Sequence, residues 1–337
     1  MDRRLLLLVA ALGTPATAQT APKPGEVKTF GDWSVACDNV RRCAMASLGP
    51  ADGGDWPELS IQAARGAAAG AGWEIQLFTQ RDASPRPVAF VIDGKRFPFD
   101  GDQLAGPGAA AIVAALPDAH SLSVMGARGG PLGRYSAKGL SATLRYIDAQ
   151  QGRAGTVTAV VAKGAQPADT VPAAPAAPVV PALALGKGPA LATAQLAQMR
   201  RLAECDLPED AGIGPETATS GDAILVILPC SSGAYNVSGA LFVVGGGKVA
   251  PAALDAPAGF DATGAGENAA VKSVVNGTFD GDRLSSYAKG RGLGDCGVAQ
   301  SFAWDGAHWR LVEQSEMREC RGNPDFLRTR TARATGR

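Results

Sequence analysis

Six cysteines are the residues of this sequence with the most definite chemistry. They fall into three local groups: Cys37 with Cys43, Cys205 with Cys230, and Cys296 with Cys320. A metal site would need closely spaced cysteine and histidine ligands, but no Cys-x-x-Cys occurs and the chain has 2 histidines. An even number of cysteines is typical of disulfides in an exported protein. Short loops close most readily, so the spacing favours pairing within each group, although six cysteines allow about 15 pairings. We expect no bound metal and no cofactor.

Charged residues flank the last cysteine group and could form a binding site. If Cys296 pairs with Cys320, the neighbouring Asp295 and Arg321 come close together, and Arg291 is four residues from Asp295. Such an Arg/Asp/Arg group could hold an anionic ligand or a carboxylate of a partner. Trp304 could supply an aromatic wall beside it. The alternatives are an ion pair that only fixes the loop and a tryptophan that packs in the core.

Signatures of catalysis are weak in this sequence. Residues 292–297 satisfy G-x-G-x-x-G, but a strand is predicted after them, whereas a dinucleotide site requires a helix there. No Gly-x-Ser-x-Gly motif is present, so a nucleophilic serine is not indicated. Paired carboxylates of a hydrolase would leave no fixed spacing, which keeps that alternative open. We therefore expect no catalytic residues and a protein that binds rather than catalyses.

The N-terminus has the three parts of a secretory signal peptide. Arg3 and Arg4 form the charged region, residues 5–12 the apolar region, and residues 16–18 an Ala-x-Ala cleavage site. This predicts cleavage near Ala18 and a periplasmic or secreted protein. No segment is apolar over the length of about 20 residues that a membrane-spanning helix needs.

A segment rich in proline and alanine, residues 164–190, divides the remaining chain. Its prolines at 172, 175, 178 and 181 recur every three residues, which favours a polyproline II spacer. We expect an N-terminal domain at 25–163 and a C-terminal domain at 191–328. Alternatively, the segment lies along one domain as an extended arm.

The pattern of short apolar segments predicts a mostly β fold with a few helices, that is, a β-rich α+β fold. Leu, Ile, Val and Phe make up only about a fifth of the chain, which predicts a lean core, and 43 Gly and 23 Pro indicate many turns. We expect two disulfide-braced domains of the sandwich or open-barrel kind. Strands are predicted at 30–37, 43–48, 73–77, 87–92, 122–125, 156–162, 223–228, 235–244, 271–276, 298–304 and 308–313. Helices are predicted at 109–116 and 193–204, and a further one has Leu140, Leu144 and Ile147 on one face and Gly152 just past its end.

Several short motifs are spread over nearly the whole chain after the signal peptide. They are KTFGDWSVACDN at 28–39, GLSATL at 139–144, IDAQQGR at 147–153, AYN at 234–236, KGRGLGDCG at 289–297, WDG at 304–306 and CRG at 320–322. Together they resemble the bacterial domain-of-unknown-function family 1176, from about residue 25 to 330. The N-terminal half is also similar to the invasion-associated locus B family through its FGDW-x-V-x-C opening and its GLSATL helix. The resemblance implies export from a Gram-negative bacterium and supplies no activity to carry over.

These observations favour an exported, non-catalytic binding protein of the bacterial envelope. Its partner would be an envelope protein or a glycan, since the 32 basic and 32 acidic residues lack the positive excess of a nucleic-acid-binding protein. The alternatives are a carboxylate-based envelope hydrolase and an inhibitor of a lysozyme-like enzyme, in which the loop from Arg291 to Asp295 would enter the active site. The sequence does not indicate an oligomeric state.

Overall fold

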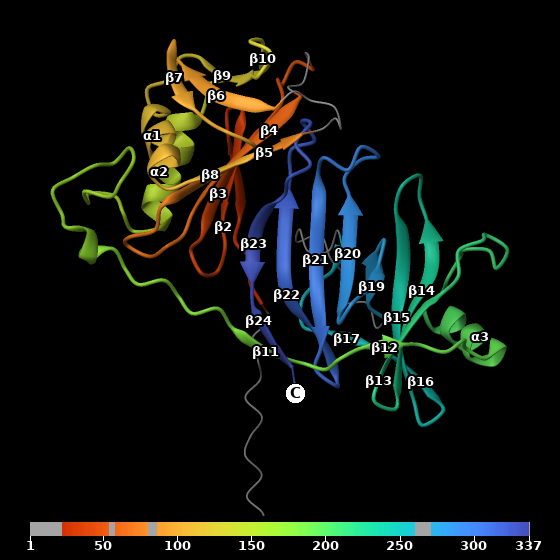
Figure 1. Ribbon diagram of the computed structural model, residues 1–337. Coiled ribbons are helices and arrows are strands. Elements are labelled where there is room, and N and C mark those ends of the chain that lie inside the picture. Colours follow the sequence, from red (N-terminus) through yellow and green to blue (C-terminus); the bar gives the residue numbers. More distant parts are fainter. Residues whose placement is uncertain (1–21, 54–57, 80–85, 260–270, 337) are drawn as a thin grey trace, which may run out of the picture.

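The computed structural model describes residues 22–53, 58–79, 86–259 and 271–336 (Figure 1). The predicted signal peptide at 1–18 lies outside these residues. Strands dominate the described chain, so the prediction of a mostly β protein is confirmed. In the described ranges, no helix has the length and apolar character to cross a membrane.

Two antiparallel sheets and two helices form the N-terminal half, by which we mean residues 22–163 as far as they are described. The first sheet has the strand order β1-β2-β3-β4-β5-β8 and the second β10-β9-β6-β7. The bounds are β1 Val27–Phe30, β2 Trp33–Cys37, β3 Cys43–Ser47, β4 Leu59–Arg65, β5 Trp73–Thr79, β6 Pro87–Ile92, β7 Lys95–Pro98, β8 Gln103–Ala105, α1 Pro107–Ala115, β9 Leu122–Gly126, β10 Pro131–Tyr135 and α2 Leu140–Gln150.

The central strands β2 and β3 of the first sheet are buried on both faces. Large side chains such as Trp33 and Met45 point into the core that the two sheets share with the helices. The opposite face carries alanines, including Ala36 and Ala44, which pack against the C-terminal half around Met317. Alternation along a strand places every second residue on the same face, and small residues on that face allow a close approach between the halves.

The C-terminal half, residues 191–336, is built around two facing sheets, one of which also includes the short strand β12 from the Pro/Ala-rich segment. One has the order β12-β13-β14-β15-β16 with β18 also paired to β15, and the other β17-β22-β21-β20-β19 with β23 paired to β22. The bounds are β12 Gly186–Lys187, α3 Thr193–Leu202, β13 Glu216–Ser220, β14 Ala223–Ser232, β15 Val237–Gly245, β16 Lys248–Pro251, β17 Ala253–Leu254, β18 Ser273–Val275, β19 Thr278–Asp280, β20 Arg283–Lys289, β21 Gly297–Trp304, β22 His308–Met317, β23 Leu327–Thr331 and β24 Arg333–Gly336.

A sandwich core lies between these two sheets. Leu225 and Leu241 of one sheet pack with Phe302, Trp304 and Trp309 of the other. The outer face of β14 and β15 is covered by α3 through Met199. Because β14 is buried on both faces, its sequence is a continuous apolar run rather than an alternating one.

The Pro/Ala-rich segment makes several contacts with the rest of the protein. It contains the 3-10 helix Ala168–Thr170 and the strand β11 (Val179–Ala182), which pairs in parallel with β24 at the C-terminus. Further on, β12 pairs with β13. Near its start, the Arg41 guanidinium donates to the carbonyl oxygens of Pro172 and Ala173. The division of the chain into domains at this segment stays a prediction.

Two predicted strands differ from the structure. Residues 30–37 form two strands, because a turn at Gly31 and Asp32 separates β1 from β2. Residues 156–162 form an irregular loop rather than a strand. Their backbone amides at Val160, Val161 and Ala162 donate to the buried carboxylate of Asp148, so they do not take part in a sheet.

Candidate functional site

Three disulfides brace the fold, and one of them closes the loop that the sequence singles out. They join Cys37 to Cys43, Cys205 to Cys230 and Cys296 to Cys320, the pairs that the spacing favours. Cys296 ends the connection between β20 and β21, here called the 289–296 loop. The last disulfide therefore ties this loop to the segment that follows β22.

An ion pair fixes the 289–296 loop from within. The Arg291 guanidinium donates to both oxygens of Asp295, with Nε–Oδ1 at 2.7 Å and the second contact at 2.5 Å. The Asp295 carboxylate also accepts the backbone N–H of Gly322 at 2.6 Å. Burial by itself would raise the pKa of Asp295, but the hydrogen bonds from Arg291 and Gly322 hold it below its ordinary value. The Asp295 carboxylate is therefore fully hydrogen-bonded within the protein, and it helps to fix the shape of the loop.

Two tyrosines hold the backbone of the same loop. The Tyr287 hydroxyl donates to the Gly294 carbonyl at 2.5 Å, and the Tyr235 hydroxyl donates to the Gly290 carbonyl at 3.2 Å. Gly294 has φ +68°, and a Cβ there would lie 2.9 Å from the Tyr287 hydroxyl, so glycine is required for this approach. Between these anchors lies Leu293, which is 69% exposed.

A pair of asparagines fixes the base of the loop. Asn236 Oδ1 accepts the backbone N–H of Lys289 at 3.1 Å, and Asn236 Nδ2 donates to the Lys289 carbonyl at 2.9 Å. Asn276 Nδ2 donates to Asn236 Oδ1 at 2.8 Å and to the Tyr287 carbonyl. The segments at 235–237 and 276 thus hold the end of β20.

The four residues predicted to bind a ligand occupy three different environments. Arg291 and Asp295 come together as the pair described above. Arg321 follows the disulfide, but its guanidinium turns away to the N-terminal half, where it binds Asp32. Trp304 is 2% exposed and packs on Trp309 in the sandwich core, with ring centroids 5.2 Å apart, so it forms no exposed wall.

Arg321 connects the two halves of the molecule. Besides the Asp32 carboxylate, its guanidinium donates to the carbonyls of Gly49 (Nε at 2.9 Å) and Gly31 (3.2 Å). The Arg321 and Asp32 side chains are only 15% and 16% exposed. Burial would raise the pKa of Asp32, but hydrogen bonds from Arg321 and Ser136 and the charges of Arg321 and Lys138 lower it.

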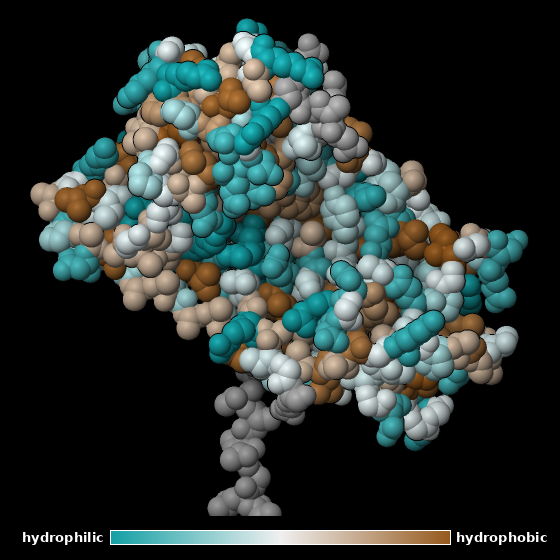
Figure 2. All heavy atoms as spheres, in the orientation of Figure 1, coloured by the Kyte–Doolittle hydropathy of each residue, from teal (hydrophilic) through white to brown (hydrophobic). Residues whose placement is uncertain are grey.

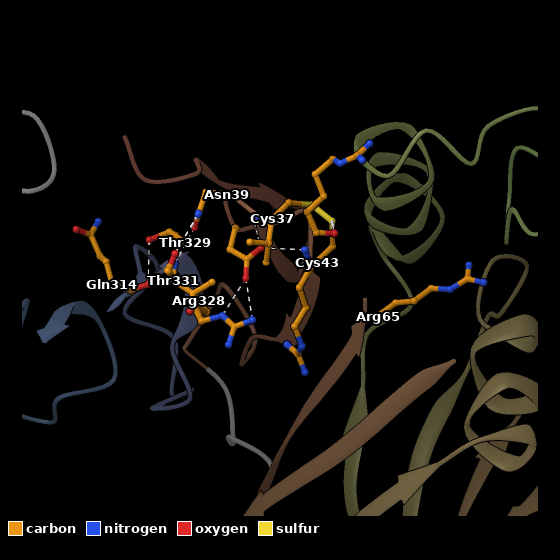
Figure 3. Close-up of polar contacts among 12 residues, drawn as sticks. Cys37, Asn39, Cys43, Arg65, Gln314, Arg328, Thr329 and Thr331 are labelled. Carbon is orange, nitrogen blue, oxygen red and sulfur yellow. Dashed lines mark hydrogen bonds and ion pairs between the residues drawn. A yellow bond between two sulfur atoms is a disulfide. The ribbon is translucent and has the colours of Figure 1, made fainter. Parts of the chain in front are cut away.

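A second set of contacts between the halves lies along β23. Figure 3 shows Thr331 of this strand beside Asn39, near the disulfide-linked end of the β2–β3 hairpin, with Arg328 on the same strand. Arg328 Nε lies 2.9 Å from the buried carboxylate of Asp38, and Asn39 exchanges two hydrogen bonds with the backbone of Thr331. Figure 2 shows hydrophilic side chains gathered where β23 passes this hairpin.

A partly buried carboxyl group lies farther along this junction. The Ser60 hydroxyl donates to Asp325 at 2.5 Å, and burial raises the pKa of Asp325 to about 6. Asn323, which is 1% exposed, donates to the Ser47 carbonyl. The sequence analysis did not predict these contacts, because they join residues more than 260 positions apart. The polar sequence of the neighbouring strand β23 was the one sign that this segment makes polar contacts.

Two pockets include residues of the contacts described above. One, of about 350 Å³, adjoins the Cys296–Cys320 disulfide and includes the buried Glu316 carboxylate, which accepts from Arg318 at 2.6 Å. The other, of about 320 Å³, includes Asp32 and lies in the N-terminal half. Over the described ranges, no group of three or more His, Cys, Asp or Glu side chains is placed to hold a metal ion.

Two carboxylates of the C-terminal half share one guanidinium. Arg310 Nε lies 2.6 Å from Asp305, and its terminal nitrogen lies 3.9 Å from Asp255. Burial raises the pKa of Asp255. Burial would also raise that of Asp305, but hydrogen bonds from the His308 and Ala307 amides and from Arg310 lower it. Asp305 accepts the amides of the β21–β22 turn, so this pair has a clear structural role in the hairpin.

The fold and site define a disulfide-braced, mostly β protein whose fixed loop lies close to the contact between its two halves. Residues 27–330 match the model of a family described as proteins of unknown function (DUF1176), and the chain belongs to that family. The chain is similar to the uncharacterized protein YpfG of Escherichia coli (strain K12), with 29% identity over 348 residues and 94% of each chain covered.

A solved structure gives a slighter likeness. Invasion associated protein b from Bartonella henselae matches with 19% sequence identity and a TM-score of 0.29, over 38% of this chain and 99% of that one. A score at this level establishes neither a common fold nor a common function.

Proposed function

We propose that the protein is an exported, non-catalytic binding protein of the bacterial envelope, and that it contacts a partner protein through the 289–296 loop. The observation that carries this proposal is the position of Leu293. It is the most exposed of the large apolar side chains in the described residues, at 69%. Its loop is held by a disulfide, an ion pair and two tyrosine hydroxyls.

Pre-organisation is the reason to connect this loop with binding. A contact residue on a mobile loop loses conformational freedom when a complex forms, and a loop already fixed in its bound shape avoids much of that cost. Two side chains of kinds enriched at interface centres belong to or contact this loop: Arg291 is part of it, and Tyr235, which is 41% exposed, donates to its Gly290 carbonyl. When a partner covers such an exposed apolar side chain, the loss of its contact with water stabilises the complex.

Export is supported by the three disulfides. Such bonds persist in oxidising compartments such as the periplasm and are rare in the cytosol. The predicted signal peptide at 1–18 would direct the chain there. These two features together support a periplasmic or secreted location.

Photo-crosslinking in a Gram-negative host tests the proposal. A photoreactive amino acid replaces Leu293, and a matched control carries it at Val157, which is 61% exposed in the N-terminal half. We expect a discrete adduct with one envelope protein from position 293 and not from position 157. Purification of that protein then allows its affinity to be measured, and Leu293→Asp should weaken binding about tenfold or more, as the loss of a central interface contact does. Identical adducts from both positions, or no adduct at 293, would refute the proposal.

The same loop supports one specific version of this function, inhibition of a lysozyme-like enzyme. A projecting loop of fixed shape can enter an active site with little rearrangement. A panel of lysozymes should then lose activity in the presence of the wild-type protein and keep it with Leu293→Asp. Full activity of every lysozyme in the panel would exclude inhibition of lysozymes. The broader proposal of a partner contact at Leu293 would then be decided by the crosslinking experiment.

A further inference from the structure

A second candidate site lies in the N-terminal half, in the pocket of about 320 Å³ beside Arg321. One wall comes from residues 48–52, which follow β3, and another from Arg134, Ser136 and Lys138, at the end of β10 and just before α2. Asp32, in the turn between β1 and β2, completes it. The pocket is therefore framed by three turns, each anchored to a strand or helix of the first half.

Arg134 and Lys138 are the two positively charged side chains that line this pocket, together with the carboxylates of Asp32 and Asp52. Arg134 and Lys138 are exposed, and neither forms an ion pair with another residue of the described ranges. The nearest acid, Asp32, is engaged by the buried guanidinium of Arg321 and is also close to Lys138. Asp52 is the other acid of the wall. With Arg321 included, three positive groups and two carboxylates leave an excess of one positive charge.

We infer that this pocket binds an anionic group, either a carboxylate or a phosphate, through Arg134 and Lys138. Guanidinium groups offer paired N–H donors that match the oxygens of both anions, and an ammonium group adds a compact charge. Because both side chains are exposed, these attractions act in a solvated site and weaken as the salt concentration rises. The anion could be a free small molecule or an acidic group on a polypeptide.

This site shares no residue with the 289–296 loop, so it goes beyond the proposed function and can be tested separately. The test uses the full mature chain with four probes: inorganic phosphate, acetate, and two short peptides that end in a free or an amidated carboxyl group. The double variant Arg134→Gln/Lys138→Gln removes both charges. A matched control, Lys95→Gln/Arg96→Gln, removes two exposed charges from β7 in the same half.

Binding is measured by amide chemical-shift changes in NMR titrations, at low salt because screening weakens such contacts. We expect wild type and control to bind phosphate or acetate with amide shifts around residues 134–138. The pocket variant should bind at least about tenfold more weakly, as expected for the loss of both charged contacts. Preference for the free-carboxyl peptide over acetate would assign the anion to a polypeptide, and the reverse would assign it to a small molecule.

Two outcomes would overturn the inference. One is the absence of saturable binding of all probes by the wild-type protein. The other is equal binding by wild type and the pocket variant, with thermal unfolding showing that both are folded. Because Leu293→Asp leaves this pocket intact, it should bind the anions like wild type, so failure of the proposed function would be distinguished from failure of this site.

Discussion

Removing the Arg321 side chain should loosen the contact between the two halves. In Arg321→Ala, the Asp32 carboxylate loses its ion-pair partner, and the Gly49 and Gly31 carbonyls lose their donors. Deleting one partner of a buried ion pair costs about 3–5 kcal/mol, because the remaining charge is left uncompensated. Both side chains keep some exposure, 15% and 16%, so we expect the lower part of that range, about 3 kcal/mol.

The pH dependence supplies an independent check on this value. The pKa of Asp32 is lowered in the folded protein, so its ion pair contributes stability above the unfolded pKa of about 3.9. That contribution disappears as the pH falls through the lowered folded value. The stability difference between wild type and Arg321→Ala should therefore be largest near pH 7 and shrink below about pH 4.

Guanidinium unfolding of the mature protein, followed by tryptophan fluorescence, measures the effect. A double-mutant cycle with Asp32→Asn isolates the ion pair, and we expect a coupling free energy of about 1.5–3 kcal/mol. Arg86→Ala is the matched control, because Arg86 pairs with Asp100 on the surface with 64% and 77% exposure, and its loss should cost about 0.5 kcal/mol. Equal stabilities of Arg321→Ala and the control, or a coupling below about 0.3 kcal/mol, would refute the reasoning.

Three further changes test other parts of the fold. Asp325→Asn should stabilise the protein above pH 6 by about 1–2 kcal/mol after allowance for partial exposure and have no effect near pH 4. The reason is that the raised pKa of Asp325 in the folded protein makes ionisation of this carboxyl group unfavourable. Urea unfolding of wild type and Asp325→Asn at both pH values measures the difference. Arg153→Met should destabilise by about 3–5 kcal/mol in the same assay, because the fully buried guanidinium donates to several loop carbonyls that would lose their partner. Replacing Cys296 and Cys320 by serine should increase hydrogen exchange in the 289–296 loop at least about tenfold, and unchanged exchange would show that the other contacts suffice.

Much of the fold follows from local sequence, and the exceptions have physical causes. The strands predicted at 73–77 and 87–92 are confirmed as Trp73–Thr79 and Pro87–Ile92, because alternation or an apolar run marks each strand directly. The strand Leu327–Thr331 has the sequence LRTRT, and its polar residues make contacts with the distant β2–β3 hairpin. A strand stabilised by such long-range polar contacts leaves no apolar pattern to read.

The loop at 153–164 shows the opposite error. Its residues include valines and threonines that favour strands, but Asp148 and Arg153 organise its backbone instead. The Asp148 carboxylate accepts three successive amides, and Arg153 spans to the carbonyls of Ala68 and Ala69. A buried charge that satisfies a loop overrides strand propensity, and sequence alone does not show which charges are buried.

The short motifs lie next to one another in the structure, and their contacts support the 289–296 loop as the candidate site. Tyr235 and Asn236 of AYN bind the base of the KGRGLGDCG loop, and the amide of Gly322 in CRG binds Asp295. Arg321 of the same CRG then reaches Asp32 of FGDW, which links the loop to the other half. Motifs that lie almost 300 residues apart therefore form one connected set of contacts. A set that served only to join the halves would have no need to hold Leu293 exposed on a fixed loop, and this is why we place the partner contact there.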